Sequence, residues 1–206
     1  MINHSQQIDF RVLDTSNGSE DRKNMRNYYA AGYLPAFMGH SKYTSRADVI
    51  NWYVHGIKKP FKTNPVIEAG FAQEIISRDK LELEIGQSLM VCTAARGKYI
   101  AAFDGITLDR KIIFEHKLYS QAKIDAMGDT CNYETNPLDF MQIVQQMYVS
   151  KAEKCIYMLA DDKRDKQARY ILTQSDVVDY YQVMIDTWLE LDAIKFRHGG
   201  QASLTN

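Results

Sequence analysis

Residues 104–117 read Asp-Gly-Ile-Thr-Leu-Asp-Arg-Lys-Ile-Ile-Phe-Glu-His-Lys and contain the pattern that decides the fold. An apolar run at 99–103 precedes them, and a polar turn inside them leads to a second apolar run, Ile-Ile-Phe. Two apolar runs joined by a short polar turn predict a β-hairpin. Glu115 and Lys117 would share one face of the second strand, because residues two apart in a strand point to the same side. The hairpin would therefore bring Asp104, at the exit of the first strand, close to Glu115.

Two carboxylates and an ammonium group at strand ends predict a site for a hard divalent cation with a positive charge beside it. Oxygen ligands of this kind select Mg²⁺ or Mn²⁺ over zinc. A helix predicted upstream adds Glu74, one turn after Gly70, and glycine permits close approach of another backbone. The alternative is a surface hairpin whose charges are solvated. The metal site gains support because the acids follow apolar runs instead of alternating with apolar residues along an exposed face, but residue types alone still favour the solvated hairpin.

The composition predicts a single globular domain over residues 1–206, with an extended arm at 1–18 and a flexible tail at 197–206. Hydrophobic content of 45% and charged content of 25% are ordinary for such a domain. No apolar run has the length of a membrane helix, and the N-terminal residues lack the pattern of a signal peptide, so we expect a cytoplasmic protein. Three cysteines without CxxC spacing argue against a disulfide scaffold or a structural zinc site.

The hydrophobic pattern predicts a mixed α/β fold of the α+β type. Helices are expected at 20–31, 45–54, from Pro65 onward, at 138–149 and at 175–194. Strands are expected at 81–85, 88–95, 99–103, 112–114, 154–159 and 169–173. In the helix that begins at Pro65, the spacing of Ile67, Phe71 and Ile75 predicts an apolar face.

The order Gly70-x-x-x-Glu74, Asp104-Gly, Glu115-x-Lys117 resembles the PD-(D/E)xK nucleases and, more closely, the phage lambda exonuclease / YqaJ viral recombinase family. Residues 31–43 are similar to the N-terminal region of that family, and residues 140–149 resemble its glutamine-bearing helix. The resemblance covers roughly residues 25–173. It implies a restriction-endonuclease-like core, in which helices flank a central mixed sheet.

The resemblance also implies a role for each residue of the motif. Asp104 and Glu115, with the backbone carbonyl of His116, would hold a catalytic Mg²⁺, for which Mn²⁺ would substitute. Glu74 would bind a second metal ion, directly or through water. Lys117 would position or activate the attacking water and stabilise the charge that develops on the phosphorus. Hydrolysis of a phosphodiester requires these contributions.

The glutamine-bearing helix and the N-terminal region raise the question of how a DNA end is held. Gln142 would face the scissile nucleotide or the 5′ end, the alternative being an exposed helical glutamine. Relatives in the family anchor the 5′-phosphate with an arginine and serines, and the corresponding positions here are Ala30, Phe37 and Ala102. The 5′-phosphate is therefore held differently, or the preference for it is weak. Arg26 is the candidate replacement, although a solvated helix face is the more common setting for a single arginine.

A net charge of −1 means that any DNA-binding surface must be a local basic patch. The loop at 56–65 is such a patch, since Lys58, Lys59 and Lys62 could clamp a phosphate backbone. A solvated loop is an equally good interpretation.

The resemblance implies a Mg²⁺-dependent exonuclease that digests double-stranded DNA from a 5′ end. The resulting 3′ single strand would serve a single-strand annealing protein in phage-type recombination, in a bacterial host or a phage or prophage. Relatives form a ring-shaped homotrimer around DNA, so we expect a homo-oligomer. The alternatives are a structure-selective endonuclease with the same core and a non-catalytic module that binds DNA ends.

Overall fold

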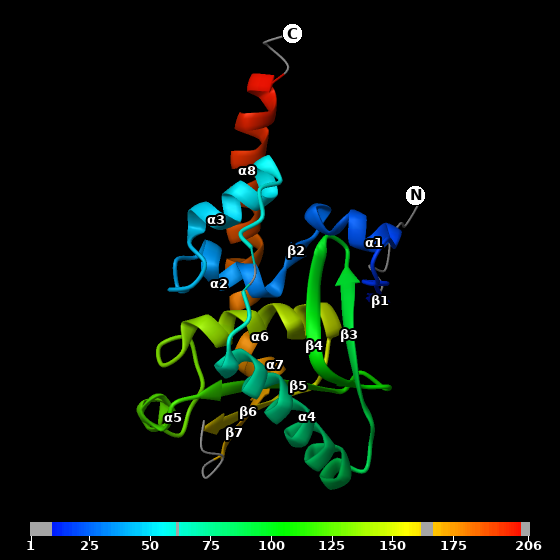
Figure 1. Cartoon of the computed structure of the whole chain (residues 1–206), viewed down its shortest axis with the longest axis vertical. Helices are drawn as coiled ribbons and strands as arrows, with labels where there is room; N and C mark the ends of the chain where they lie inside the picture. Colours follow the sequence, from blue (N-terminus) through cyan, green and yellow to red (C-terminus); the bar gives the residue numbers. More distant parts are fainter. Residues whose placement is uncertain (1–9, 61, 162–166, 203–206) are drawn as a thin grey trace.

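The computed structural model describes residues 10–60, 62–161 and 167–202, with side chains described as far as His198. A seven-stranded sheet has the order β1-β3-β4-β5-β6-β7, and β2 pairs with β4 outside this path (Figure 1). The strands are β1 Phe10–Val12, β2 Tyr29–Ala30, β3 Leu89–Arg96, β4 Tyr99–Thr107, β5 Ile112–Tyr119, β6 Lys154–Asp161 and β7 Gln167–Thr173. The pairs β5–β6 and β2–β4 are parallel and the other pairs are antiparallel. The predicted mixed α/β fold is confirmed.

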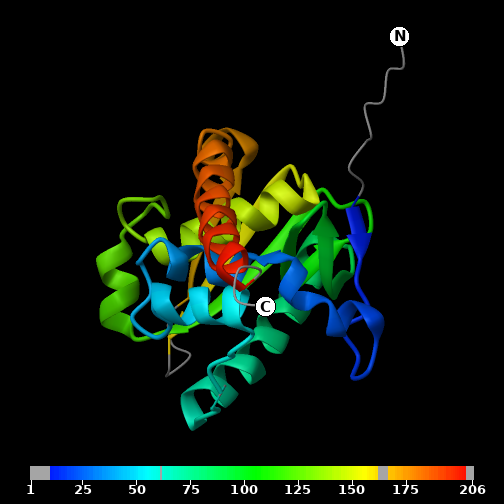
Figure 2. The ribbon, with the colours of Figure 1, turned by 90° about the horizontal axis from the view of Figure 1, so that it is seen from above.

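Helices cover both faces of this sheet (Figures 1 and 2). They are α1 Glu20–Lys23, α2 Leu34–Phe37, α3 Arg46–Ile50, α4 Pro65–Ile85, α5 Gln121–Met127, α6 Pro137–Ser150, α7 Gln174–Val177 and α8 Tyr180–Ala202. Two short 3₁₀ helices, η1 Met25–Asn27 and η2 Ala31–Tyr33, and one π-helix, η3 Asn51–His55, complete the described elements. None of the helices in the described residues is long and apolar enough to cross a membrane.

The predicted hairpin is present, with Gly105 opposite Phe114 and Ile106 opposite Ile113. The strand prediction was too short, because β4 continues past Asp104 to Thr107. Asp104 therefore lies inside the strand and not at its exit. Gly105 allows this close packing of three strands, since a Cβ added to it would lie 2.9 Å from the Cβ of Leu89 and 3.3 Å from that of Phe114.

Gly105→Ala is expected to destabilise the fold by about 1–3 kcal/mol, because an overpacked core must shift backbone to accept a methyl group. The free energy of unfolding in urea measures the effect. Gly32→Ala is the matched control, since a Cβ there meets no atom within 4 Å and the backbone is not left-handed. Equal stability of the two variants would contradict the packing argument.

Helix α4 differs from its prediction in length and in orientation. It runs to Ile85, so the strand expected at 81–85 is wrong; Leu81 is buried and Leu83 is 86% exposed, as on two sides of a helix. The predicted apolar face is also wrong, since Phe71 and Ile75 are 55% and 50% exposed. The buried side carries Gln73, Ser77 and Leu81, spaced four apart. Hence α4 presents polar side chains to the sheet.

The N-terminal helix expected at 20–31 is mostly replaced by other structure. Only α1 is α-helical; η1 follows, and Tyr29 and Ala30 form β2 beside Tyr99 and Ile100 of β4. Pairing with the sheet satisfies backbone groups that a continued helix would have used internally. The helix expected at 45–54 is present as α3 and η3, with a capping box at Ser45.

The C-terminal region forms two helices where one was predicted. The side chain of Thr173 caps α7, and α8 continues to Ala202, beyond the expected end at residue 194 and into the predicted tail. Figure 1 shows α8 extending away from the sheet past the other elements. Trp188 of α8 anchors it in the core, stacked against Tyr29 with 4.7 Å between ring centroids. Residues 1–9 of the expected arm and the last four residues lie outside the described part.

Helices α4 and α6 pack against opposite faces of the sheet. Phe140 and Val144 of α6 share the main core with Ile113 of β5. Leu81 of α4 forms a second core with Phe114, the next residue along β5. Because successive strand residues alternate between faces, Glu115 points toward α6 and His116 toward α4.

Candidate active site

The hairpin brings two acids of the predicted site together at the centre of the sheet. The Asp104 carboxylate of β4 accepts a hydrogen bond from the backbone N–H of His116 in β5, with 2.9 Å between Oδ2 and N. Glu115, the neighbour of His116, is only 1% exposed. The predicted proximity of the two acids is thus found in the structure, while their catalytic roles stay predictions.

Both oxygens of the Glu115 carboxylate are held by donors. Its Oε1 accepts from the ammonium group of Lys117 and from Nε2 of Gln142, the latter at 2.7 Å. Its Oε2 accepts from Nε2 of Gln146 at 2.5 Å. Gln146 also donates to the backbone carbonyl of Ala102 at 3.0 Å, which ties α6 to β4. Lys117 and Gln142 are themselves partly exposed, so they connect the buried Glu115 carboxylate with the solvent-accessible side of the site.

Helix α4 supplies Glu74 to the same site. Arg78, one turn later, lies with its Nη1 3.2 Å from Oε1 of Glu74 and 3.0 Å from the backbone carbonyl of Asp104. The guanidinium therefore joins α4 to β4 beside the acids. The packing around position 70 does not require glycine, since a Cβ there would lie 3.7 Å from the Cβ of Leu118, an ordinary contact distance.

The site concentrates negative charge away from water. Burial raises the pKa of Glu115 to about 7, and the charge of Asp104 adds to the increase. Burial likewise raises the pKa of Asp104 and of Glu74. Burial alone would lower the pKa of Lys117, but attraction to Glu115 and Asp104 outweighs it, so that pKa is raised. Two protein cations, Lys117 and Arg78, thus face three acids, and one further cation would complete the compensation of their charge.

The oxygen atoms at this site suit a hard cation that takes only some of its ligands from the protein. Among the described residues, no group of three or more His, Cys, Asp or Glu side chains forms a ready-made metal site. Asp104, Glu115 and Glu74 supply carboxylate oxygens to the site, and the resemblance adds the backbone carbonyl of His116 as a predicted donor. Mg²⁺ is commonly held by one or two carboxylates, with water and substrate oxygens completing its shell. The donor set therefore fits Mg²⁺.

The His116 imidazole is not part of this donor set. It is 5% exposed, and burial lowers its pKa to about 4. Its Nε2 has no hydrogen-bond partner among the described residues. It belongs to the face covered by α4, as the alternation along β5 requires.

Several residues at the site were not predicted from the sequence. Gln146 and Arg78 each lie four residues after a predicted residue, Gln142 and Glu74, so helical spacing was the available signal. Asp139 had no such signal, and it is buried where it accepts hydrogen bonds from Tyr119, Tyr157 and Asn136.

Gln146→Leu is expected to lower cleavage by about tenfold and to raise the Mg²⁺ concentration needed for half-maximal activity, because removal of a positioning contact to a metal ligand typically costs 10–100-fold. Cleavage rates across a Mg²⁺ titration measure both effects. Gln182→Leu is the control, since Gln182 lies on α8 and bonds Asp186. A Gln146 variant that needs no more Mg²⁺ than the control would contradict this role.

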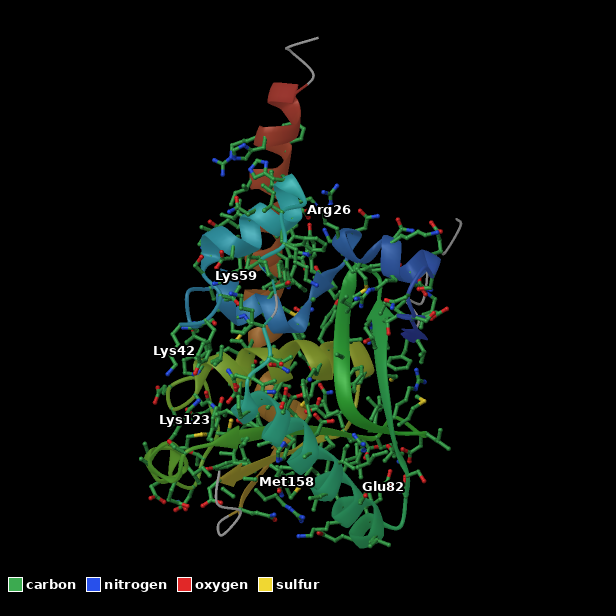
Figure 3. The ribbon with its side chains drawn as sticks, in the orientation of Figure 1. Arg26, Lys42, Lys59, Glu82, Lys123 and Met158 are labelled. Atoms are coloured by element: carbon green, nitrogen blue, oxygen red, sulfur yellow. The ribbon has the colours of Figure 1, made fainter. Side chains whose placement is uncertain are left out.

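A second group of cations borders Lys117. The ammonium group of Lys123 lies 3.2 Å from the centroid of the Tyr119 ring. Burial lowers the pKa of Lys123; the charge of Asp139 opposes this decrease, and the charges of Lys42 and Lys117 add to it. Figure 3 shows Lys42 and Lys123 on the same side of the molecule. These like charges at the border of the site favour an anionic ligand.

The predicted DNA-binding residues other than Gln142 lie apart from the acids. Lys59 donates to the backbone carbonyl of Tyr43 at 2.9 Å and pairs with Asp48, and Lys58 lies over the Trp52 ring. Lys62 is exposed. Arg26 lines a separate cavity beside η3. Within the described residues, none of these four contacts the three acids.

The positions where relatives carry a 5′-phosphate anchor have different surroundings here. Phe37 is fully buried and stacked against Trp188, so no side chain at this position reaches a substrate. Ala30 is half-buried and Ala102 is exposed.

Three solved structures share this fold. The alkaline exonuclease LHK-Exo from Laribacter hongkongensis matches with a TM-score of 0.67 and 16% identity, over 91% of this chain and 100% of that chain. Its complex with dAMP matches with a TM-score of 0.68 at the same identity and coverage. A phage-related exonuclease from Haemophilus somnus 129PT matches with a TM-score of 0.58 and 13% identity, over 88% and 100% of the two chains. No family model and no curated protein sequence matches the chain.

These similarities establish the fold. The restriction-endonuclease-like core expected from the sequence resemblance is confirmed, and the proteins that share it are exonucleases.

Proposed function

We propose that this protein is a Mg²⁺-dependent exonuclease that digests one strand of double-stranded DNA from a 5′ end. The observation that carries the proposal is the buried Glu115 carboxylate, which touches Lys117 and Gln142 and lies beside Asp104. A fold shared with exonucleases supports the same conclusion.

In the proposed reaction, Asp104, Glu115 and the His116 carbonyl would hold the cation, and Glu74 would hold a second one directly or through water. When bound, the cation would supply Lewis-acid activation of the scissile phosphate and of the attacking water. Lys117 positions that water and stabilises the negative charge on the phosphoryl oxygens. Gln142, on the accessible side of Glu115, faces the scissile nucleotide.

The remaining features of the proposal rest on the sequence resemblance. They are a product with a 3′ single-stranded overhang, transfer of that strand to a single-strand annealing protein, and a trimeric ring that encloses DNA. Lys42 and Lys123 add a basic border through which the strand could approach Lys117.

The test is digestion of linear duplex DNA labelled at one 5′ end, with and without a 5′-phosphate, in Mg²⁺ and in EDTA. The expected result is Mg²⁺-dependent release of mononucleotides from the 5′ end. A covalently closed circular duplex should remain intact, and cutting of the circle would instead indicate an endonuclease. Tight binding to DNA ends without cleavage in Mg²⁺ or Mn²⁺ would refute the nuclease and indicate a binding module.

A further inference from the structure

Three segments that are distant in the sequence form a basic cavity of about 390 Å³. Arg26 of η1, His55 of η3, and Lys195 and His198 of α8 line it, with Tyr53 at its base. Figure 1 shows these three segments together at the end of the molecule where α8 projects, and Figure 3 shows Arg26 there. No acidic residue is among the described residues that line the cavity. Its volume lies within the range of ligand-binding pockets.

Neither Arg26 nor Lys195 forms a salt bridge in the part of the chain that the structure describes. Asp192 lies one turn before Lys195 on α8, and its carboxylate is bound by Lys98, at 2.6 Å, and by the Tyr29 hydroxyl. The Asp192 charge also attracts Lys195. The cavity therefore holds one uncompensated guanidinium, Arg26, one ammonium group that Asp192 compensates in part, Lys195, and two imidazoles.

The backbone at η3 is shaped around Arg26. Gly56 ends η3 in the left-handed conformation, with φ of 73°, and a Cβ added to it would lie 2.4 Å from Nη1 of Arg26. Glycine thus leaves room for the guanidinium against the end of the helix. The residues of η3 that line the cavity belong to a π-helix, a rare form that occurs often at functional sites.

We propose that this cavity binds a phosphate group, and that the phosphate belongs to the backbone of the DNA substrate. A guanidinium presents paired donors that match phosphate oxygens, and an ammonium group adds a point charge. The aromatic rings that line the cavity leave no free face for a base, since Tyr53 is 2% exposed, its hydroxyl accepts from the backbone N–H of Ala30, and the His55 and His198 rings pack edge to face with 5.5 Å between centroids. This absence favours a backbone phosphate over a free nucleotide.

The assignment of the bound phosphate to DNA rests on the proposed nuclease function. The segment that follows Arg26 pairs with Ile100 of β4, four residues before Asp104 on the same strand. At about 3.3 Å per strand residue, Ile100 lies about 13 Å from Asp104, and Arg26, which precedes the parallel strand β2, lies farther along the same direction. Duplex DNA rises about 3.4 Å per base pair, so a duplex of two turns is several times longer than this strand segment and could reach both the cavity and the acids.

The first experiment detects phosphate itself. Inorganic phosphate is titrated into the full chain while NMR follows the imidazole C–H signals of His55 and His198, with sodium chloride at matched ionic strength as the blank. We expect saturable shifts in the wild type, their loss in Arg26→Ala, and their retention in Lys111→Ala. Lys111 is the matched control because it is an exposed lysine that pairs with Glu153 away from the cavity.

The second experiment measures binding of a fluorescent 24-base-pair duplex in EDTA, where no cleavage takes place, over a range of KCl concentrations. Arg26→Ala and Lys195→Ala should each weaken binding by roughly fivefold and reduce the slope of log Kd against log salt by about 1. Lys111→Ala should change neither. Gly56→Ala, which displaces the tip of the Arg26 side chain but retains every charge, should weaken binding less than Arg26→Ala does, provided that its thermal unfolding shows a folded protein.

The outcomes separate the parts of the proposal. Shifts with phosphate together with weaker duplex binding in the cavity variants support a site for the DNA backbone. Shifts with phosphate but unchanged duplex binding support a site for free phosphate and overturn the assignment to DNA. If phosphate shifts no imidazole signal and the cavity variants bind duplex as the wild type does, the cavity is not a phosphate site. A wild type that binds duplex through the cavity but never cleaves it in Mg²⁺ would refute only the nuclease.

Discussion

Lys117→Ala is expected to lower the rate of duplex cleavage by about 10²–10³-fold at saturating Mg²⁺, the typical cost of removing one group that stabilises charge in a transition state. The ammonium group is the only described side-chain cation in contact with the Glu115 carboxylate. Because its contribution is expected in the transition state, kcat should fall while the Kd for duplex measured in EDTA changes little. Single-turnover cleavage of end-labelled duplex measures the first quantity, and fluorescence anisotropy measures the second.

Lys111→Ala serves as the control for this substitution, since it removes an exposed lysine far from the acids along the hairpin. Circular dichroism and thermal unfolding establish that the Lys117 variant is folded. If a folded Lys117→Ala protein cleaves duplex within threefold of the wild-type rate, Lys117 does not have the role proposed for it.

Without a divalent cation, the free energy of unfolding is expected to fall as the pH rises from about 4.5 to 7. The pKa of Glu115 is about 7 in the folded protein and near its ordinary value of 4.5 in the unfolded chain. The folded state therefore binds the proton more tightly, so this contribution is complete below pH 4.5 and is lost as the pH passes 7. Half-buried Asp104, whose pKa is also raised, contributes in the same direction.

Binding of Mg²⁺ or Mn²⁺ should reverse this loss, because the cation binds the ionised carboxylates. At a concentration about 100 times its Kd, the cation adds about 2.7 kcal/mol of stability, which raises the Tm of a protein of this size by roughly 5–10 °C. The increase should be larger at pH 8 than at pH 5.5, and it should be reduced strongly in Glu115→Gln. Differential scanning fluorimetry with and without Mn²⁺ measures it; Glu153→Gln, in the exposed pair with Lys111, is the control. An increase independent of pH, or equal in the two variants, would place the cation elsewhere.

The sequence predicted the centre of the site better than its surroundings, for physical reasons. Local patterns determine a hairpin, so the contact between Asp104 and Glu115 followed from two apolar runs and a turn. The orientation of α4 depends on what it packs against. Phe71 and Ile75 have the spacing of a buried face, yet the helix directs Gln73 and Ser77 inward beside the site.

The hydrophobic pattern of the sequence does not predict contacts between residues that are far apart along the chain. The hydrogen bond from Gln146 to Glu115 joins a helix to a strand 31 residues away. The basic cavity requires Arg26, His55 and Lys195 to meet, and only the packing of α8 through Trp188 brings the last of these into place. The prediction of a strand at 81–85 failed because alternating leucine and isoleucine over five residues occur in a helix as readily as in a strand.

The pairing of β5 with β6 over its whole length has a consequence for how the site can move. We expect the backbone hydrogen bonds in the middle of such a ladder to open mainly through global unfolding, so the amide hydrogens around Glu115 should be among the slowest to exchange. Local opening around the acid that is proposed to hold the cation should therefore be rare. Any adaptation to a bound strand must come from elements outside the ladder, namely α4 with Glu74 and Arg78, or the loop before it. The site thus combines a rigid half, fixed by the sheet, with a half that can adjust.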